Sequence, residues 1–291
     1  MTSYSIWWLA VRPKTLSISV TPVLLGSALA RHEQNNFSLV TFLVILLSAI
    51  AIQIGTNLYN DAADFEKGAD TEHRLGPERA AQQGWLNSRQ IKAGALMSFL
   101  LAFFFGIYLA WIGGWAIIIL GLTAILCGYG YTAGLRPIAY SPLGELFVFL
   151  FFGLAAVGGT YYLQSQTLNP QVLLFASTIG CMAAAILLIN NYRDLDSDRK
   201  AQKLTLVNYT GRPVARLIFA ALLIYPYLLL PVWMNEFSWY ILLPTLSLPL
   251  ALKLIYSLFH MPVSSKLNRL LAQTAQLQLF YTVLLSSVLI L

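Results

Sequence analysis

The chain has 291 residues, of which 58% are apolar and only 10% are charged, and its mean hydropathy is +0.68. A soluble globular domain carries about 25% charged residues, so this composition excludes ordinary soluble, disordered and disulfide-framework proteins and indicates a polytopic membrane protein. The net charge of +6 does not indicate nucleic-acid binding, which requires a basic surface in water. Both cysteines, Cys127 and Cys181, lie in apolar runs, so a disulfide framework is not expected.

Nine apolar segments approach the length of about 20 residues that a helix needs to cross a bilayer. In chain order they are Leu16–Ala30, Leu39–Leu58, Ala93–Trp111, Trp115–Tyr131, Leu143–Leu163, Val172–Asn190, Val214–Trp233, Trp239–Leu258 and Leu271–Leu291. The sequence therefore predicts an all-α protein with nine transmembrane helices, forming one domain over residues 1–291. Two cytoplasmic loops are expected at about 59–92 and 191–213.

The basic residues predict the orientation of the chain. With nine spans and a cytoplasmic amino terminus, all 18 Lys and Arg residues except Arg31 fall on the cytoplasmic side. Cytoplasmic loops are enriched in Lys and Arg. We therefore predict a multi-pass protein of a bacterial plasma membrane, with its carboxyl terminus on the opposite side and its active site facing the cytoplasm.

The 12 acidic residues are concentrated in two places. Six lie between Asp61 and Glu78, at the end of the second predicted span, and three lie between Asp194 and Asp198, at the end of the sixth. An Asp at the centre of a membrane helix costs about 2.5–3.5 kcal/mol. A chain with so few charges is therefore expected to concentrate acids at two helix ends only where another interaction compensates for this cost.

The two acidic segments also resemble each other. Residues 57–67 and 190–200 both contain Asn-x-Tyr-x-Asp and both end in lysine. In each segment an asparagine and two aspartates recur at three- or four-residue spacing, which places them on one face of a helix. The residues on these two faces are Asn57, Asp61 and Asp64, and Asn190, Asp194 and Asp198.

Carboxylate and amide oxygens are ligands for Mg²⁺, which is usually held by one or two carboxylates together with substrate phosphates. Two acidic faces would repel a diphosphate unless divalent metal ions lay between them. The spacing therefore predicts metal-bridged diphosphate binding at the cytoplasmic rim of a membrane cavity. The alternative is that the acids are solvated loop residues, an interpretation that fits Glu66, Glu72 and Glu78 best.

Several motifs together resemble the UbiA superfamily of intramembrane aromatic prenyltransferases, and the resemblance extends over nearly the whole chain. The motifs are Arg12–Thr15, Asn57–Asp64, Lys67–Thr71, Arg74–Pro77, Tyr131–Pro137, Phe149–Gly153, Gly159–Tyr162 and Asn190–Arg199. The chain looks most like the members that prenylate 1,4-dihydroxy-2-naphthoate. It departs from the family at Gly68, where relatives carry another Asp, and Asp70 is the nearest substitute.

The resemblance implies a UbiA-like fold, with nine helices around a central cavity that opens to the cytoplasm. It implies Mg²⁺-dependent transfer of a polyprenyl group from polyprenyl diphosphate to 1,4-dihydroxy-2-naphthoate. This reaction releases carbon dioxide and diphosphate and gives demethylmenaquinol in menaquinone biosynthesis. The lipid bilayer is the other implied partner, and no protein partner or nucleic acid is expected.

The resemblance also implies roles for individual residues. The expected catalytic metal ligands are Asp61, Asp64, Asp194 and Asp198, completed by Asn57 and Asn190. The expected diphosphate-binding residues are Lys67, Arg136, Arg193 and Lys203. Arg12 and Lys14 are candidates for the acceptor carboxylate, Tyr131 lies with them in the substrate site, and Tyr59, Tyr131 and Tyr161 are candidates to stabilise an allylic cation. The loop from Arg74 to Arg89 is expected to close over the site.

Three other functions compete with this interpretation. The same chemistry on a hydroxybenzoate or homogentisate-type acceptor is the nearest alternative. A transporter would place its acids near helix centres, whereas these lie at one rim. A phosphatidyl-alcohol transferase would carry its Asp residues in one continuous segment, whereas these lie in two distant ones.

Overall fold

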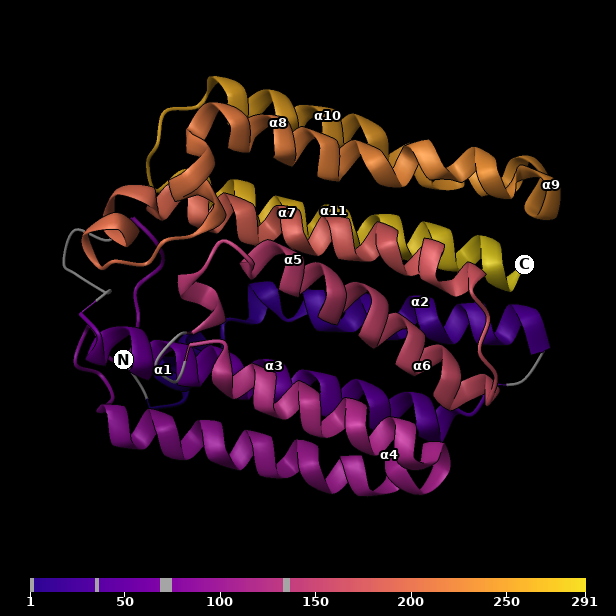
Figure 1. The fold of residues 1–291 in the computed structure, drawn as a ribbon, viewed down its shortest axis with the longest axis horizontal. Coiled ribbons are helices and arrows are strands. Elements are labelled where there is room, and N and C mark those ends of the chain that lie inside the picture. The colour runs from indigo at the N-terminus through magenta and orange to yellow at the C-terminus, as the bar shows by residue number, and fades with distance from the viewer. Residues whose placement is uncertain (1–2, 35–36, 69–74, 133–136) are drawn as a thin grey trace.

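The computed structural model describes residues 3–34, 37–68, 75–132 and 137–291. Long helices run side by side along the longest axis of the molecule (Figure 1), and these residues form helices without any strand, as predicted. The α-helices are α1 Ser3–Val11, α2 Ser17–Gln34, α3 Leu39–Glu66, α4 Ser88–Gly130, α5 Gly144–Val148, α6 Ala156–Ser165, α7 Gln171–Lys200, α8 Leu206–Leu229, α9 Met234–Phe237, α10 Leu248–His260 and α11 Leu267–Ile290. The 3₁₀ segments are η1 Pro13–Thr15, η2 Ile138–Tyr140, η4 Leu230–Trp233 and η5 Ser238–Ser247, and η3 Phe149–Ala155 is a π-helix.

The predicted count of nine separate spans was wrong. Within the described residues, six helical segments are long and apolar enough to cross a membrane. Two of them, Ser88–Gly130 and Leu206–His260, each cover two of the predicted spans. The helix α2, which corresponds to the first predicted span, does not qualify because it ends in the polar sequence Arg31-His-Glu-Gln34.

Breaks in the backbone explain why two helical segments cover four of the predicted spans. Gly114 has a φ of 62° inside α4, and the helix turns back on itself there (Figure 1). Ser238 has a φ of 54° between α9 and η5. Glycine adopts positive φ without a Cβ penalty, so Gly114 allows the reversal that the sequence had placed between two spans.

The helix α7 is the central element of the bundle. Its most apolar stretch is 83% buried inside the protein, whereas no other candidate span exceeds 50%. Small residues along α7, including the run Ala183–Ala185, let its neighbours approach closely. The helix that carries the second acidic segment is therefore held on all sides by protein.

The π-helix η3 packs directly against α7. A Cβ added at Gly153 would lie 2.7 Å from the Cα of Gly180 and 2.9 Å from the carbonyl oxygen of Ala176. The two backbones are thus in contact at a pair of glycines. π-Helical turns occur frequently at functional sites, and this one places Phe151 and Phe152 in the wall of the cavity described below.

This contact predicts that Gly153→Ala destabilises the protein. The added methyl group meets backbone atoms that cannot move aside, and overpacking of this kind costs about 1–3 kcal/mol. A lower apparent melting temperature of the purified protein, followed by tryptophan fluorescence, is the expected result. Gly158→Ala is the control, since nothing lies within 4 Å of a Cβ there. Equal melting temperatures for the two variants would contradict the close contact.

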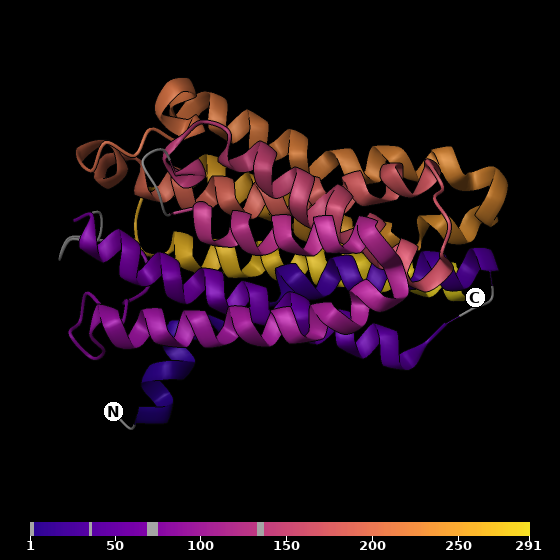
Figure 2. The ribbon, with the colours of Figure 1, turned by 60° about the horizontal axis from the view of Figure 1, so that its bottom comes forward.

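The two acidic segments lie at the same end of the bundle. Figure 1 shows the carboxyl-terminal ends of α3 and α7 on the left, together with α1 and the loops that follow both helices. Figure 2 shows α1 projecting from the side of the bundle at this end. The chain therefore brings together two sequence segments that are separated by more than a hundred residues.

Candidate active site

A cavity of about 310 Å³ lies between α2, α3, α4, η3 and α7. Much of its wall is apolar and aromatic, with Phe147, Phe151 and Phe152 prominent among the lining residues. Its main polar and charged lining residues are Arg12, Asn57, Asn60, Asp64, Arg79, Thr132, Asn190, Asn191 and Lys203. Several of them come from the acidic segments, so the cavity has a charged end and an apolar body.

The first acidic segment supplies two buried carboxylates from the last turns of α3. Arg79 donates from Nη1 to Asp64 Oδ2 at 3.0 Å, and Tyr140 donates its hydroxyl to Asp64 Oδ1 at 3.2 Å. Asp61 Oδ2 accepts a hydrogen bond from the backbone N–H of Ala80 at 3.1 Å. Arg79 and Ala80, which follow α3 in the chain, therefore lie against the end of that helix.

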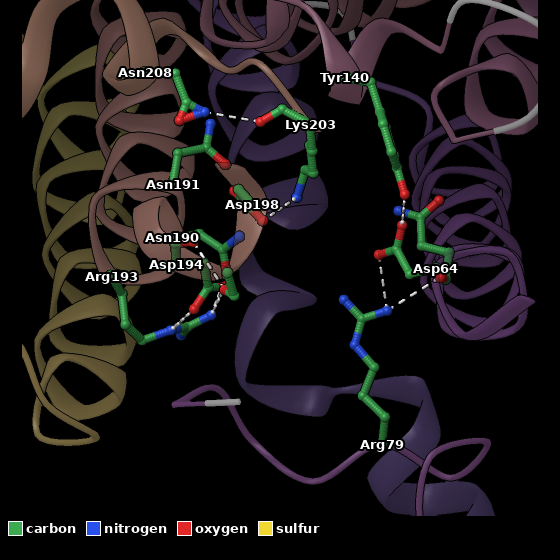
Figure 3. A network of polar contacts seen from close by, with 12 residues as sticks. Asp64, Arg79, Tyr140, Asn190, Asn191, Arg193, Asp194, Asp198, Lys203 and Asn208 are labelled. Atoms are coloured by element: carbon green, nitrogen blue, oxygen red, sulfur yellow. Dashed lines mark hydrogen bonds and ion pairs between the residues drawn. The ribbon is translucent and has the colours of Figure 1, made fainter. Parts of the chain in front are cut away.

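The second acidic segment lies across from Asp64 (Figure 3). Arg193 is only 2% exposed and donates to both oxygens of Asp194, at 2.7 and 2.5 Å. It also donates to Asn190 Oδ1 at 2.8 Å. The Nζ of Lys203 lies 3.4 Å from Asp198 Oδ1. Each of these carboxylates thus has a basic partner close by.

The donor chemistry fits a hard cation. Within the described residues, the buried Oδ1 of Asp61 and Oδ2 of Asp198 have no hydrogen-bond partner, and buried carboxylate oxygens are costly without one. Among the residues that the structure describes, however, no three acidic, histidine or cysteine side chains gather around one point. Asp194 is held by Arg193 and Asp64 by Arg79, so a metal ion would have to compete with guanidinium groups for these oxygens.

Lys67 lies at the end of α3, outside the helix itself. Its Nζ donates to the carbonyl oxygen of Thr132 at 2.6 Å. Burial lowers the pKa of this ammonium group, and the nearby Asp64 carboxylate acts in the opposite direction. Lys67 therefore lies close enough to Asp64 for the carboxylate to offset part of the effect of burial on this ammonium group.

Comparison with known proteins connects this geometry to a family. Residues 19–283 match the UbiA prenyltransferase family. The chain belongs to the UbiA prenyltransferase family. It is 35% identical to a 1,4-dihydroxy-2-naphthoate octaprenyltransferase of Haemophilus influenzae, over 97% of this chain and 94% of that protein. It is 37% identical to the Escherichia coli protein of the same name, over 75% of this chain and 72% of that protein.

Solved structures show that the fold is that of UbiA proteins. The chain superposes on a UbiA homologue from Aeropyrum pernix with a TM-score of 0.70 at 15% identity, covering 96% of this chain and 98% of that one. A UbiA homologue from Archaeoglobus fulgidus, bound to GPP and Mg²⁺, gives a TM-score of 0.69 at 16% identity, covering 98% and 99%. The protein is a UbiA prenyltransferase.

The UbiA fold brings some of the predicted site residues to the cavity and leaves others outside it. The predicted residues that line the cavity are Arg12, Asn57, Asp64, Tyr131, Asn190 and Lys203. The lining residues do not include Asp61, Asp194, Asp198, Arg193 or Lys67, which the structure also describes. Lys14 is exposed. Arg136, Asp70 and Arg74 lie outside the described residues.

Two of the three tyrosines proposed to stabilise a cation have other partners. Tyr161 donates its hydroxyl to Glu33, at the end of α2 far from the acidic segments. Tyr59 packs against Tyr129, with ring centroids 4.6 Å apart. Tyr131 alone of the three lines the cavity.

Sequence reasoning missed several residues of this UbiA site. Arg79 lines the cavity from the loop after the first motif, and Tyr140 binds Asp64 from η2. Asn191 also lines the cavity, and it donates to the buried carboxylate of Glu145 at 2.9 Å. The one available signal was the adjacent pair Asn190-Asn191, in which both side chains are polar at the end of an apolar helix.

Proposed function

We propose that this UbiA prenyltransferase transfers a polyprenyl group from polyprenyl diphosphate to 1,4-dihydroxy-2-naphthoate, with loss of carbon dioxide and diphosphate, to give demethylmenaquinol. The main support is a single cavity that joins a charged end, suited to a diphosphate, to an apolar body, suited to an isoprenoid. The names of the relatives from H. influenzae and E. coli support the choice of acceptor. A hydroxybenzoate or homogentisate-type acceptor is the alternative.

A second cavity supports the polyprenyl substrate. Its volume is about 420 Å³, and nearly all of its lining is apolar. Ala49, Ile52, Ala124, Phe151 and Ala156 line both cavities, so the second continues directly from the first. An isoprenoid chain would bury its hydrocarbon surface along this path, at about 0.8 kcal/mol per buried CH₂ group.

For the diphosphate end we propose that Mg²⁺ is held by Asp64 and Asp198, with Asp61, Asp194, Asn57 and Asn190 as the further candidates. When bound, Mg²⁺ offsets the negative charge of the departing diphosphate. Arg79 and Lys203 line the same end of the cavity and donate directly to phosphate oxygens in this proposal. Lys67, Arg193 and Arg136 remain predicted diphosphate residues.

The acceptor is expected at the mouth of the cavity near Arg12. This residue lines the cavity and adopts a φ of 58° between α1 and η1. A guanidinium group can bind a carboxylate through two parallel hydrogen bonds, and hydroxynaphthoate carries one carboxylate. Lys14, two residues further, stays a candidate for the same role.

The reaction is tested with membranes that contain the protein. Labelled polyprenyl diphosphate, Mg²⁺ and dihydroxynaphthoate should yield a prenylated naphthoquinol, with release of carbon dioxide. Parallel reactions with 4-hydroxybenzoate and homogentisate discriminate among acceptors. A prenylated product from either of these, and none from dihydroxynaphthoate, would replace the proposed acceptor with the alternative.

We also propose that the acid-bearing end of the bundle faces the cytoplasm of a bacterial cell. Almost all Lys and Arg residues fall on that side of the predicted topology. The amino terminus then lies in the cytoplasm and the carboxyl terminus on the opposite side. A cytoplasmic opening gives soluble acceptor and diphosphate direct access to the charged end of the cavity.

A further inference from the structure

The side chain of Tyr140 lies against two charged residues of the first acidic segment and against one that follows the second segment. Its hydroxyl donates to Asp64 Oδ1 at 3.2 Å, and the Nζ of Lys67 lies 4.7 Å from its ring centroid. The Nζ of Lys203, which follows the second segment, lies 5.9 Å from the same centroid. Figure 3 shows Tyr140 reaching down from its loop to Asp64, with Lys203 across from it.

The two ammonium groups carry like charges, so they do not approach each other without a compensating group. Among the described residues, Lys67 also contacts the carbonyl oxygen of Thr132, and Lys203 also contacts the carboxylate of Asp198. The face of an aromatic ring attracts cations that lie within about 6 Å of its centroid. The Tyr140 ring therefore stabilises both lysines in one small region beside the cavity.

The backbone holds Tyr140 in this place. It ends the 3₁₀ turn η2, in which the N–H of Tyr140 bonds to the carbonyl oxygen of Pro137 at 3.0 Å. The N–H of Ala139 donates to the carbonyl oxygen of Tyr131 at 2.9 Å, which ties this turn to the end of α4. Proline fixes its own φ, so Pro137 further limits how the turn can move.

We infer that Tyr140 is a positioning residue for the diphosphate, an inference that rests on the proposed prenyl transfer. Its ring keeps Lys67 and Lys203 on one side of Asp64, so that two cations meet the diphosphate together. Its hydroxyl fixes the orientation of the Asp64 carboxylate. Tyr140 thus couples the two acidic segments, although it belongs to neither.

The inference is tested by measuring diphosphate affinity directly. Inorganic pyrophosphate with Mg²⁺ is the probe, and its inhibition constant is measured together with the KM values for polyprenyl diphosphate and for the acceptor. Tyr140→Leu removes the ring, and it should raise the inhibition constant and the KM for polyprenyl diphosphate about tenfold while the acceptor KM stays constant. Tyr140→Phe keeps the ring, so it should retain most of the pyrophosphate affinity and lose mainly kcat.

A double-mutant cycle separates positioning from a general effect on structure. In the Tyr140→Leu background, Lys67→Ala should weaken pyrophosphate binding less than it does in the wild type, because the two residues act through one contact. Tyr240→Leu is the control, since Tyr240 is 73% exposed in η5, far from the site. This control should leave all three constants unchanged.

The outcomes distinguish this inference from the proposed reaction. Wild-type affinity for pyrophosphate in Tyr140→Leu, or equal losses toward pyrophosphate and acceptor, would overturn the inference. The inference would also be overturned if the effects of Tyr140→Leu and Lys67→Ala on the free energy of pyrophosphate binding were fully additive. If pyrophosphate binding responds as expected but no prenylated naphthoquinol forms, the proposed acceptor is wrong and the role of Tyr140 stands.

Discussion

Replacing Asp64 with asparagine should lower kcat/KM for prenyl transfer by about 1000-fold, which corresponds to about 4 kcal/mol of activation free energy. Asp64 is the one acidic residue of the first segment that lines the cavity, and it holds Arg79 and Tyr140 through separate oxygens. Asparagine has nearly the same shape but no charge to hold Mg²⁺ or a guanidinium group. The measurement is the initial rate of product formation at varied polyprenyl diphosphate.

Glu66→Gln is the matched control for Asp64→Asn. Glu66 lies two residues further along the same helix, is about half exposed, and pairs with Lys92 at 2.7 Å. An exposed pair of this kind contributes only about 0–1 kcal/mol, so we expect nearly wild-type turnover. Comparable losses in the two variants would show that the first acidic segment acts through its overall charge rather than through Asp64.

Removal of divalent metal should abolish turnover, with a loss of more than about 100-fold. The two acidic segments face each other, and without a cation between them their carboxylates repel a diphosphate. The measurement is the rate of transfer after chelation with EDTA and dialysis. Re-addition of Mg²⁺ should restore the rate.

Two comparisons sharpen the metal experiment. Ca²⁺ should restore much less activity than Mg²⁺, because it is larger and takes six to eight oxygen ligands at longer distances. Pyrophosphate binding should be lost together with turnover, since in the proposed mechanism the same ions would hold the diphosphate. Full turnover in thoroughly chelated membranes would exclude the metal-bridged mechanism and leave Arg79, Lys203 and their neighbours as the only countercharges.

Helical periodicity was enough to predict where the acidic residues gather. Asn190, Asp194 and Asp198 lie on one face of α7, and the ends of α3 and α7 meet because an even number of crossings separates them. Periodicity could not give the number of continuous helices. The break at Gly114 coincides with a predicted boundary, and helical residues follow it directly on both sides, without a connecting loop between the two arms of α4.

Contacts between the helix ends and the segments that pack back against them could not be predicted from the sequence. The pairing of Arg79 with Asp64 depends on the path of the loop after α3, and the position of Tyr140 depends on a short 3₁₀ turn. Asn57 was predicted to bind metal, yet its Nδ2 donates to the carbonyl oxygen of Val11 at 3.0 Å and so anchors the end of α1. Local spacing identifies which residues are polar on a face, whereas the partner of each is decided by tertiary structure.

The position of the second cavity bears on the length of chain that the enzyme can accept. Phe103, Ile107 and Leu122 line this cavity, and each is also between 45% and 55% exposed on the outer surface. Its wall is therefore one side chain thick where the protein meets hydrocarbon. In the proposed reaction, a tail longer than the cavity would extend into the bilayer rather than into water, and a prenylated quinol would leave the site directly into the hydrocarbon in which it diffuses.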